Sequence, residues 1–255
     1  MPLRQTDAIV IGGHNLAEAD RIVPFFTRRF GKVRLVAEGA RRIRSRYGGS
    51  LELFTFGRLV FFEREGKSLH RINEFAVVES FGVLREDLDR IGRGAYLVDL
   101  VASLTEEADR NEGVFHLLHQ GLRYLGLPEG SDLLVRGFEV RLMAALGYQP
   151  ELKACVRCRA PLPEGARLAL SAEAGGLVCP RCARDAPGGA PVGPEAVAFL
   201  RRALVTDLSR LAQPALPEAA LRELEEGLRA YIHARLGRGL RSANFLERIR
   251  ATLPP

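Results

Sequence analysis

The first eighty or so residues alternate between hydrophobic and polar positions with the period of two that is typical of β-strands. In segment 32–36, Val33 and Leu35 are predicted to face a core, while Lys32 and Arg34 face the opposite side. Five or so short strands in so few residues favour a small closed β-barrel over a sandwich. The strand-like segments are 8–11, 21–27, 32–36, 51–62 and 69–81.

From Asp87 onwards, the hydrophobic residues recur with the period of an α-helix. The pattern stops at 148–193, where glycine, proline and all four cysteines gather, and residues 185–193 are predicted to be a connector. Together the two periods predict an α+β protein. Helices are predicted at 95–104, 113–127, 131–146 (capped by Ser131 and Asp132), from Pro194 onwards, 217–236 and 242–253.

Composition narrows the class of protein. The chain has 255 residues, of which 47% are hydrophobic, a fraction too high for a disordered protein. No apolar run approaches the ~18 residues that a membrane-spanning helix needs. The segment from Met1 to Asp7 lacks the apolar core of a secretion signal, so the expected address is the cytosol.

Charge is distributed unevenly along the chain. The formal net charge is +6, and residues 1–46 alone carry ten Lys or Arg against four acidic residues. The segment 81–150 is acidic, with seven Arg against eleven acids, and 228–250 is basic again, with six Arg against one Glu. Separate surfaces for separate partners would explain this asymmetry, and the arginines at 41–46 favour phosphate binding.

The four cysteines form two CxxC pairs, Cys155/Cys158 and Cys179/Cys182. Tetrahedral Zn(II) takes four thiolates, which a CxxC turn on each side of a hairpin supplies. Two disulfides or a redox dithiol are alternatives that the cytosolic setting and the paired arrangement disfavour. A four-cysteine site has no open coordination position, so the ion is predicted to be a structural staple rather than catalytic. The alternative is a module that touches nucleic acid through Arg157, Arg159, Arg167, Arg181 and Arg184.

The motifs of common enzymes are missing. The sequence contains neither a phosphate-binding GxxxxGK[ST] loop nor a GxSxG nucleophile turn. His116 and His119 stand three residues apart on a predicted helix, a geometry that could ligate a metal, but they are interpreted as packing or interface residues. The sequence gives no positive reason to expect an enzyme.

Three stretches together resemble the RecO family of recombinational DNA-repair mediators. The first runs from Glu18 to Gly31 and on through the Gly-Ala-Arg-Arg…Ser-Arg loop to Phe54. The second is Leu146 to Pro150, leading into the cysteine pairs, and the third is Leu236 to Leu246. The resemblance covers nearly the whole chain.

The resemblance implies a fold and a function. It implies an N-terminal OB-fold at 1–82, a helical bundle at 83–147 and 190–255, and a zinc module at 148–189 inserted in the bundle. RecO-like proteins bind single- and double-stranded DNA and anneal complementary strands, including strands coated by single-strand-binding protein. They use no ATP, and they work with RecR, and in many bacteria with RecF, to load RecA. Such a protein is cytoplasmic and associated with the nucleoid.

The basic segments supply candidate contacts. Tyr47 is the candidate for a base-stacking platform.

The acidic helical middle is expected to dock proteins such as RecR. The acidic tail of single-strand-binding protein is expected near Arg235, Arg238 and Arg241. The candidate phosphate contacts are Lys32, Arg34, Arg41, Arg42, Arg44 and Arg46, and the phenylalanines interpreted as core are Phe25, Phe26, Phe54, Phe56, Phe61 and Phe62.

Two other classes remain open from sequence alone. One is an adaptor or regulator that binds structured RNA through its barrel and zinc ribbon. The other is a zinc-stapled scaffold without a nucleic-acid partner. An assay of strand annealing distinguishes the RNA-binding adaptor from a recombination mediator. A gel shift with nucleic acid distinguishes the scaffold.

Overall fold

The computed structural model describes residues 1–128, 132–184, 189–211, 215–237 and 242. The chain divides into two compact units: Met1–Gly126 with Arg241–Pro255, and Leu127–Leu240. The first unit extends beyond the predicted barrel domain because two helices pack on the barrel. The domain boundaries themselves remain a prediction. No described helix combines the length and the apolar character needed to cross a membrane.

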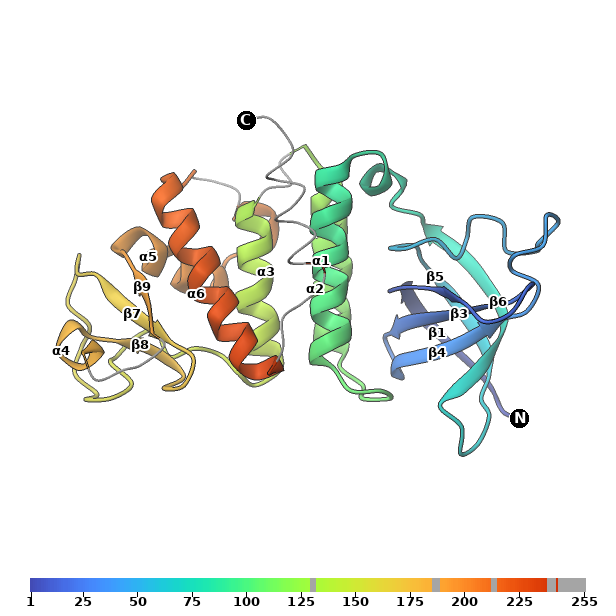
Figure 1. The fold of residues 1–255 in the computed structure, drawn as a ribbon, viewed down its shortest axis with the longest axis horizontal. Helices are drawn as coiled ribbons and strands as arrows, with labels where there is room; N and C mark the ends of the chain where they lie inside the picture. Colours follow the sequence, from blue (N-terminus) through green and yellow to red (C-terminus); the bar gives the residue numbers. More distant parts are fainter. Residues whose placement is uncertain (129–131, 185–188, 212–214, 238–241, 243–255) are drawn as a thin grey trace. The chain divides into compact units, whose positions relative to one another are not determined.

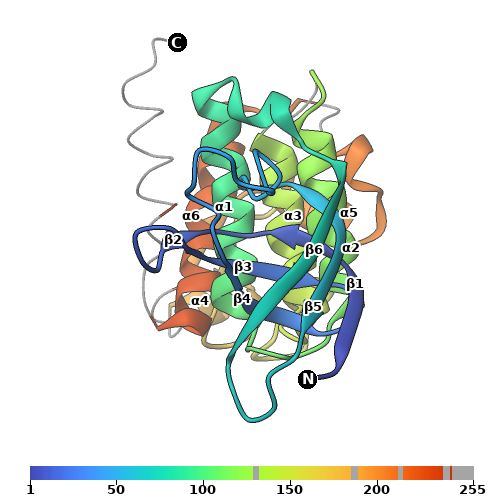
Figure 2. The same cartoon turned by 90° about the vertical axis from the view of Figure 1, so that its right-hand side faces the viewer.

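A closed barrel of five strands forms the N-terminal part of the first unit. Its strand order is β1-β5-β6-β4-β3, and the pairing of β1 with β3 closes it. The pairs are antiparallel except for β4 with β6, an OB-like topology that confirms the predicted fold class. Figure 2 looks onto this barrel, with β6 running across its front. The barrel strands are β1 (Leu3–Val10), β3 (Arg21–Thr27), β4 (Gly31–Ala37), β5 (Phe56–Phe62) and β6 (Leu69–Glu79). The short strand β2 (His14–Asn15) pairs with β3 outside this closed set.

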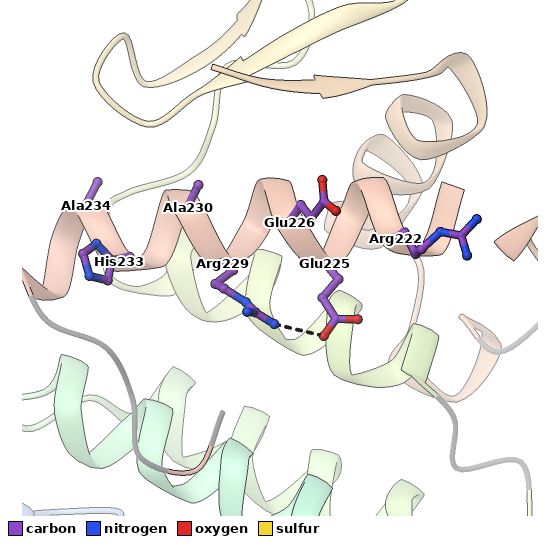
Figure 3. Close-up of a pocket in the computed structure, with 7 residues that line it drawn as sticks. All are labelled: Arg222, Glu225, Glu226, Arg229, Ala230, His233 and Ala234. Atoms are coloured by element: carbon purple, nitrogen blue, oxygen red, sulfur yellow. Dashed lines mark hydrogen bonds and ion pairs between the residues drawn. The ribbon is translucent and has the colours of Figure 1, made fainter. Parts of the chain in front are cut away.

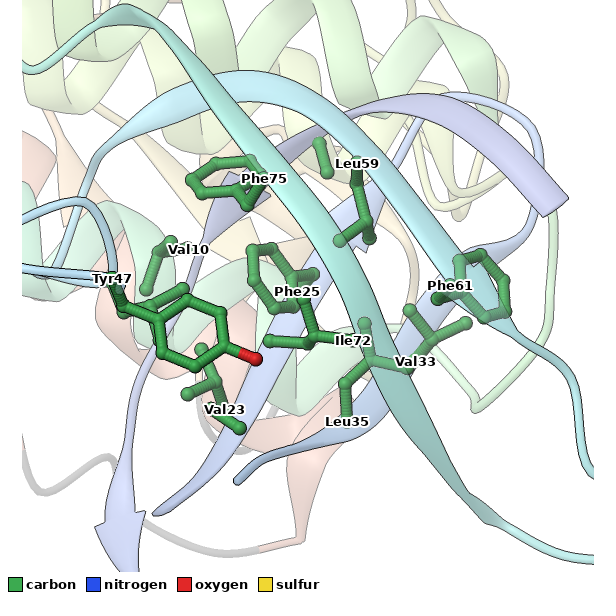
Figure 4. Packing of buried hydrophobic residues seen from close by; sticks show 13 residues of the cluster. Val10, Val23, Phe25, Val33, Leu35, Tyr47, Leu59, Phe61, Ile72 and Phe75 are labelled. Atoms are coloured by element: carbon green, nitrogen blue, oxygen red, sulfur yellow. The ribbon is translucent and has the colours of Figure 1, made fainter. Parts of the chain in front are cut away.

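The inside of the barrel holds a hydrophobic core (Figure 4). The alternation in β4 is as predicted, since Val33 and Leu35 are both buried in this cluster. Phe25 packs edge-on against Phe75, with the ring centroids 5.1 Å apart. Burying such side chains at ~25 cal/mol per Å² of apolar surface is what holds so small a barrel together.

The outer face of the barrel is covered by α1 (Leu88–Leu104) and α2 (Glu112–Leu125), which follow the short 3₁₀ helix η1 (Gly82–Arg85). Phe26 of β3 is fully buried, and its ring stacks on that of Phe115 of α2, with the ring centroids 6.5 Å apart. Phe54 lies so close to Gly94 of α1 that a Cβ atom there would be 2.9 Å from the ring. The predicted core phenylalanines are therefore divided between two cores, while Phe56 and Phe62 are only half-buried.

The second unit packs helices beside a small sheet (Figure 1). Helix α3 contacts both α5 and α6. The hairpin predicted between the cysteine pairs is β7–β8. The connector prediction is wrong for residues 190–192, which form the edge strand β9 against β7; Pro191 has no N–H to donate, which an edge strand tolerates. The predicted helix 242–253, apart from residue 242, and the Ser131 cap lie outside the described residues. The elements are α3 (Asp132–Ala145), β7 (Leu168–Ser171), β8 (Gly176–Val178), α4 (Pro180–Ala183), β9 (Ala190–Val192), α5 (Pro194–Val205), η2 (Leu208–Arg210) and α6 (Glu218–Leu236).

Candidate nucleic-acid interface and metal centre

The Arg loop, residues 41–46, lies in the turns that join β4 to β5. Its start is fixed to the connection between β1 and β3. The Arg41 backbone N–H donates to the Ala19 carbonyl at 3.0 Å, and Arg41 Nη1 donates to the Ala17 carbonyl at 2.7 Å. In OB-folds the connection between the first two barrel strands borders the oligonucleotide-binding face. The Arg loop therefore extends one border of that face.

Arg42 and Arg44 project from the Arg loop into solvent. Neither guanidinium forms an ion pair with any residue in the described ranges. Ile43 between them is also fully exposed. Since no acidic group among the described residues pairs with either charge, both are available to a phosphate without breaking a contact that the structure describes.

Lys32 and Arg34 of β4 have partners in the same unit. Lys32 Nζ donates to the carbonyls of Ala102 at 2.6 Å and Thr105 at 2.8 Å, at the carboxyl end of α1, where the helix dipole favours a cation. Arg34 Nε lies 2.8 Å from Glu107 Oε1. A phosphate would have to compete with these contacts, so the two residues differ from Arg42 and Arg44.

Arg46 and Tyr47 form a contact at the end of the Arg loop. Tyr47 belongs to the barrel core, with only 7% of its surface exposed (Figure 4). Arg46 Nη2 donates to Tyr47 Oη at 2.7 Å, and the Arg46 guanidinium covers the ring. A base could stack on this ring only if both side chains moved. Its role as a platform remains a prediction.

The hairpin between β5 and β6 carries two cations that sequence reasoning did not select, Arg64 and Lys67. Both are exposed. In the OB topology, the loop between the fourth and fifth barrel strands forms the other border of the binding face. The order of the strands in the barrel would have identified these two cations. The pattern of hydrophobic and polar residues does not reveal that order.

The four cysteines predicted as ligands converge on one point. Their Sγ atoms all lie within 4.8 Å of one another, and Cys158 Sγ is 3.9 Å from Cys179 Sγ. Cys155 precedes a tight turn in which the Arg159 N–H donates to the Cys155 carbonyl, and Cys179 is the N-cap residue just before α4. The Val156 N–H donates to the Leu177 carbonyl of β8, which fixes the first CxxC turn against the hairpin that leads to the second.

The chemistry of the donor set fits a soft divalent cation. Burial raises the pKa of the Cys155 thiol, but hydrogen bonds from the backbone N–H groups of Cys158, Cys179 and Arg157 together lower it to about 6. Hydrogen bonding with Cys179 and Cys158 raises the pKa of Cys182 to about 12. Four thiolates this close repel one another unless a cation lies between them, and tetrahedral coordination with bonds of about 2.3 Å matches their spacing. The cluster is a metal site.

Arg235 of α6 lies between two tyrosines, 5.2 Å from the Tyr148 ring centroid and 5.6 Å from that of Tyr231, and it donates to the Ala172 carbonyl. Arg238 and Arg241, predicted with it as partner contacts, lie outside the described residues.

A groove of about 550 Å³ runs along another part of α6 (Figure 3). Its two arginines, Arg222 and Arg229, pair with Glu218 and Glu225 on the same helix. The groove therefore presents balanced rather than basic charge.

An OB-like barrel, a helical region and a four-cysteine metal site define a class: a barrel protein with a metal centre and no catalytic constellation among its described residues. Comparison with known protein families agrees with this class. The family model "Recombination protein O N terminal" matches residues 1–81, and "Recombination protein O C terminal" matches residues 85–244.

Curated relatives match over almost their whole length. The DNA repair protein RecO of Symbiobacterium thermophilum is 36% identical, covering 98% of this chain and 99% of the relative. That of a Roseiflexus species is 36% identical, covering 98% and 87%, and that of Halalkalibacterium halodurans is 32% identical, covering 96% and 94%. The chain belongs to the RecO family, the non-enzymatic recombination mediators of the RecF pathway.

Proposed function

We propose that this protein binds single- and double-stranded DNA and anneals complementary strands without ATP, including strands coated by single-strand-binding protein. RecR is its partner in loading RecA, and RecF is a further partner. The site of action is the nucleoid in the cytoplasm. Family membership supports the class of function, and it favours a recombination mediator over an RNA-binding adaptor.

The observation that carries the DNA-binding proposal is the Arg loop. Arg42 and Arg44 are exposed and form no ion pair within the described chain, so they have the main role in contacting phosphates. Annealing requires no bond to be made or broken in the DNA backbone. It requires cations that offset the repulsion between two phosphate chains and leave the bases free to pair. Arg41, Arg46, Lys32 and Arg34 contribute where DNA displaces their present partners.

The ion of the cysteine site is proposed to be Zn(II), with a structural role. The four ligands leave no open coordination position, and the site lies beside a sheet with a small hydrophobic cluster of its own, including Ala169 and Val178. When bound, the ion joins the two CxxC turns. The acidic tail of single-strand-binding protein is proposed to bind near Arg235, together with Arg238 and Arg241.

The test is an annealing assay without ATP on protein-coated complementary single strands, with and without RecR. Arg42→Ala with Arg44→Ala should slow annealing, weaken DNA binding and flatten the salt dependence of single-strand affinity by about 1.4 log units per log unit of salt, the value for two lost phosphate contacts. The matched control is Arg123→Ala with Arg210→Ala, which removes two exposed arginines from helical segments.

An unchanged salt dependence in the Arg42/Arg44 variant would remove the Arg loop from the DNA site. Failure of the wild-type protein to anneal at any salt concentration would contradict the proposed function itself.

A further inference from the structure

A second group of arginines lines a cavity of about 410 Å³ at the other end of the β3–β4 hairpin. Arg28 and Arg29 come from the turn after β3, Arg58 from β5, and Arg110 from the segment before α2. We call this the Arg28 cavity. The acidic residues that line it are Asp7 and Glu112.

The two carboxylates are already bound. Arg28 Nε donates to Glu112 Oε1 at 2.7 Å, and its Nη1 lies 3.7 Å from Asp7 Oδ2. Arg110 Nη2 lies 3.3 Å from Glu112 Oε2. The hydrogen bond from Arg28 lowers the pKa of Glu112, so this carboxylate is ionised at neutral pH. Four guanidinium groups against two carboxylates leave an excess of two positive charges.

That excess resides on Arg29 and Arg58. Both are exposed, and neither forms an ion pair with residues that the structure describes. Arg58 lies opposite Asp7 in the β1–β5 register, so the β-sheet holds it at the cavity, while the Arg29 backbone N–H donates to Thr6 Oγ1. Two exposed guanidinium groups whose backbones are fixed beside a polar concavity fit a phosphate group, which accepts hydrogen bonds from both.

We propose that the Arg28 cavity is a second phosphate-binding site, which holds the backbone of a second DNA strand while the Arg loop holds the first. This inference rests on the proposed function. An annealing protein must hold two strands at once, and two like-charged chains are best held apart until bases meet.

The β3–β4 hairpin supports this separation. Arg21 pairs with Ala37 at the end beside the Arg loop, and Thr27 pairs with Gly31 at the end beside the Arg28 cavity. The seven residues of β3 span about 20 Å at ~3.3 Å per residue. The two ends of the strand are therefore too far apart for one phosphate to contact both. The described residues that line the cavity are polar or charged and include no aromatic ring for a base, so the cavity suits the sugar-phosphate chain rather than a nucleobase.

The experiment measures capture of a second strand that cannot pair with the first. The full-length protein is loaded with a donor-labelled oligo(dT), an acceptor-labelled oligo(dT) is titrated in, and energy transfer reports the ternary complex. Arg29→Ala with Arg58→Ala should bind the first strand within about twofold of wild type but bind the second roughly tenfold more weakly and anneal correspondingly more slowly. Arg123→Ala with Arg210→Ala is the matched control.

The outcomes separate the two proposals. Second-strand capture at the wild-type level by the Arg29/Arg58 variant overturns the inference. So does equal weakening of both strands, which would make the cavity part of one continuous path. If wild type binds no DNA, the proposed function fails instead. A variant that keeps capture of both strands but loses binding of an acidic peptide would assign the cavity to a protein partner and also overturn the inference.

Discussion

The guanidinium of Arg46 lies over the ring of Tyr47, with its Cζ atom 4.8 Å from the ring centroid, and donates a hydrogen bond to the phenol oxygen of the same residue. Arg46 also donates to the Ile72 carbonyl of β6. The last cation of the Arg loop thus joins the loop to the barrel wall, and the tyrosine beneath it belongs to the core.

Replacement of the tyrosine separates packing from stacking. Tyr47→Leu keeps an apolar side chain in the core, so we expect a loss of about 1–2 kcal/mol in the free energy of unfolding and an unchanged affinity of the folded protein for single-stranded DNA. Urea unfolding and fluorescence anisotropy measure the two quantities. A loss of ~1–3 kcal/mol in DNA binding by folded Tyr47→Leu, the stacking energy of one base, would instead show that the ring leaves the core to contact DNA.

The partner of Arg34 offers a gain-of-function test. Glu107→Gln removes the negative charge 2.8 Å from Arg34 Nε, and we expect single-strand affinity to rise and its salt dependence to steepen by about 0.7, the contribution of one phosphate contact. Glu225→Gln is the control, since it removes a similar ion-paired carboxylate from α6. An unchanged slope in Glu107→Gln would place Arg34 outside the path of the DNA.

Metal removal should affect stability more than DNA binding. Cys155→Ser with Cys179→Ser should abolish binding of one metal ion per chain; if ~3 kcal/mol of stability is lost, the Tm falls by roughly 6–12 °C. Metal content, measured by a chromogenic chelator, and thermal unfolding check this. Below the new Tm, annealing should persist. Arg157→Ala with Arg181→Ala keeps the ligands, and if that variant lost DNA affinity, the module would be a contact surface rather than a staple.

His119 should make stability depend on pH. Burial lowers its pKa, although Glu79 of β6 raises it in part, and Arg123 and His116 on its own helix lower it further. Because the unfolded chain takes up a proton at about pH 6.5 that the native ring resists, the free energy of unfolding should fall as the pH drops below that value. His119→Gln should flatten this decrease in Tm between about pH 7 and 5, whereas exposed His116→Gln should leave it in place. Equal profiles for wild type and His119→Gln would refute the assignment.

Local patterns were enough to predict much of the fold. The alternation that selected Val33 and Leu35 reflects the two faces of one strand, and the CxxC spacing reflects one turn, so both predictions needed only neighbouring residues. The segment 51–62 was predicted less well. Its first residues form turns because Phe54 adopts a left-handed φ of 78° and packs against α1. The strand begins only at Phe56.

The site was harder to predict because its contacts are distant in sequence. The carbonyls that bind Lys32 lie 70 and 73 residues further along the chain, and the carboxylate that binds Arg34 also lies 73 residues away. A run of cations therefore looked uniform in sequence, although backbone carbonyls at the end of α1 bind Lys32 and a carboxylate after it pairs with Arg34. The direction of the Tyr47 side chain was equally inaccessible, since a loop has no period from which to infer a face.

The way the Arg loop is attached limits how its length can vary among relatives. Ala40 packs against the barrel core on one side, and Tyr47 is buried in it on the other. Between them, Arg41 and Arg46 are themselves hydrogen-bonded to the barrel and its connections, so residues 42–44 are the ones that can be lengthened, shortened or exchanged without disturbing it. Natural variation in the affinity for DNA should therefore be concentrated in that short segment. The positions on either side of it should change only together with the residues they pack against.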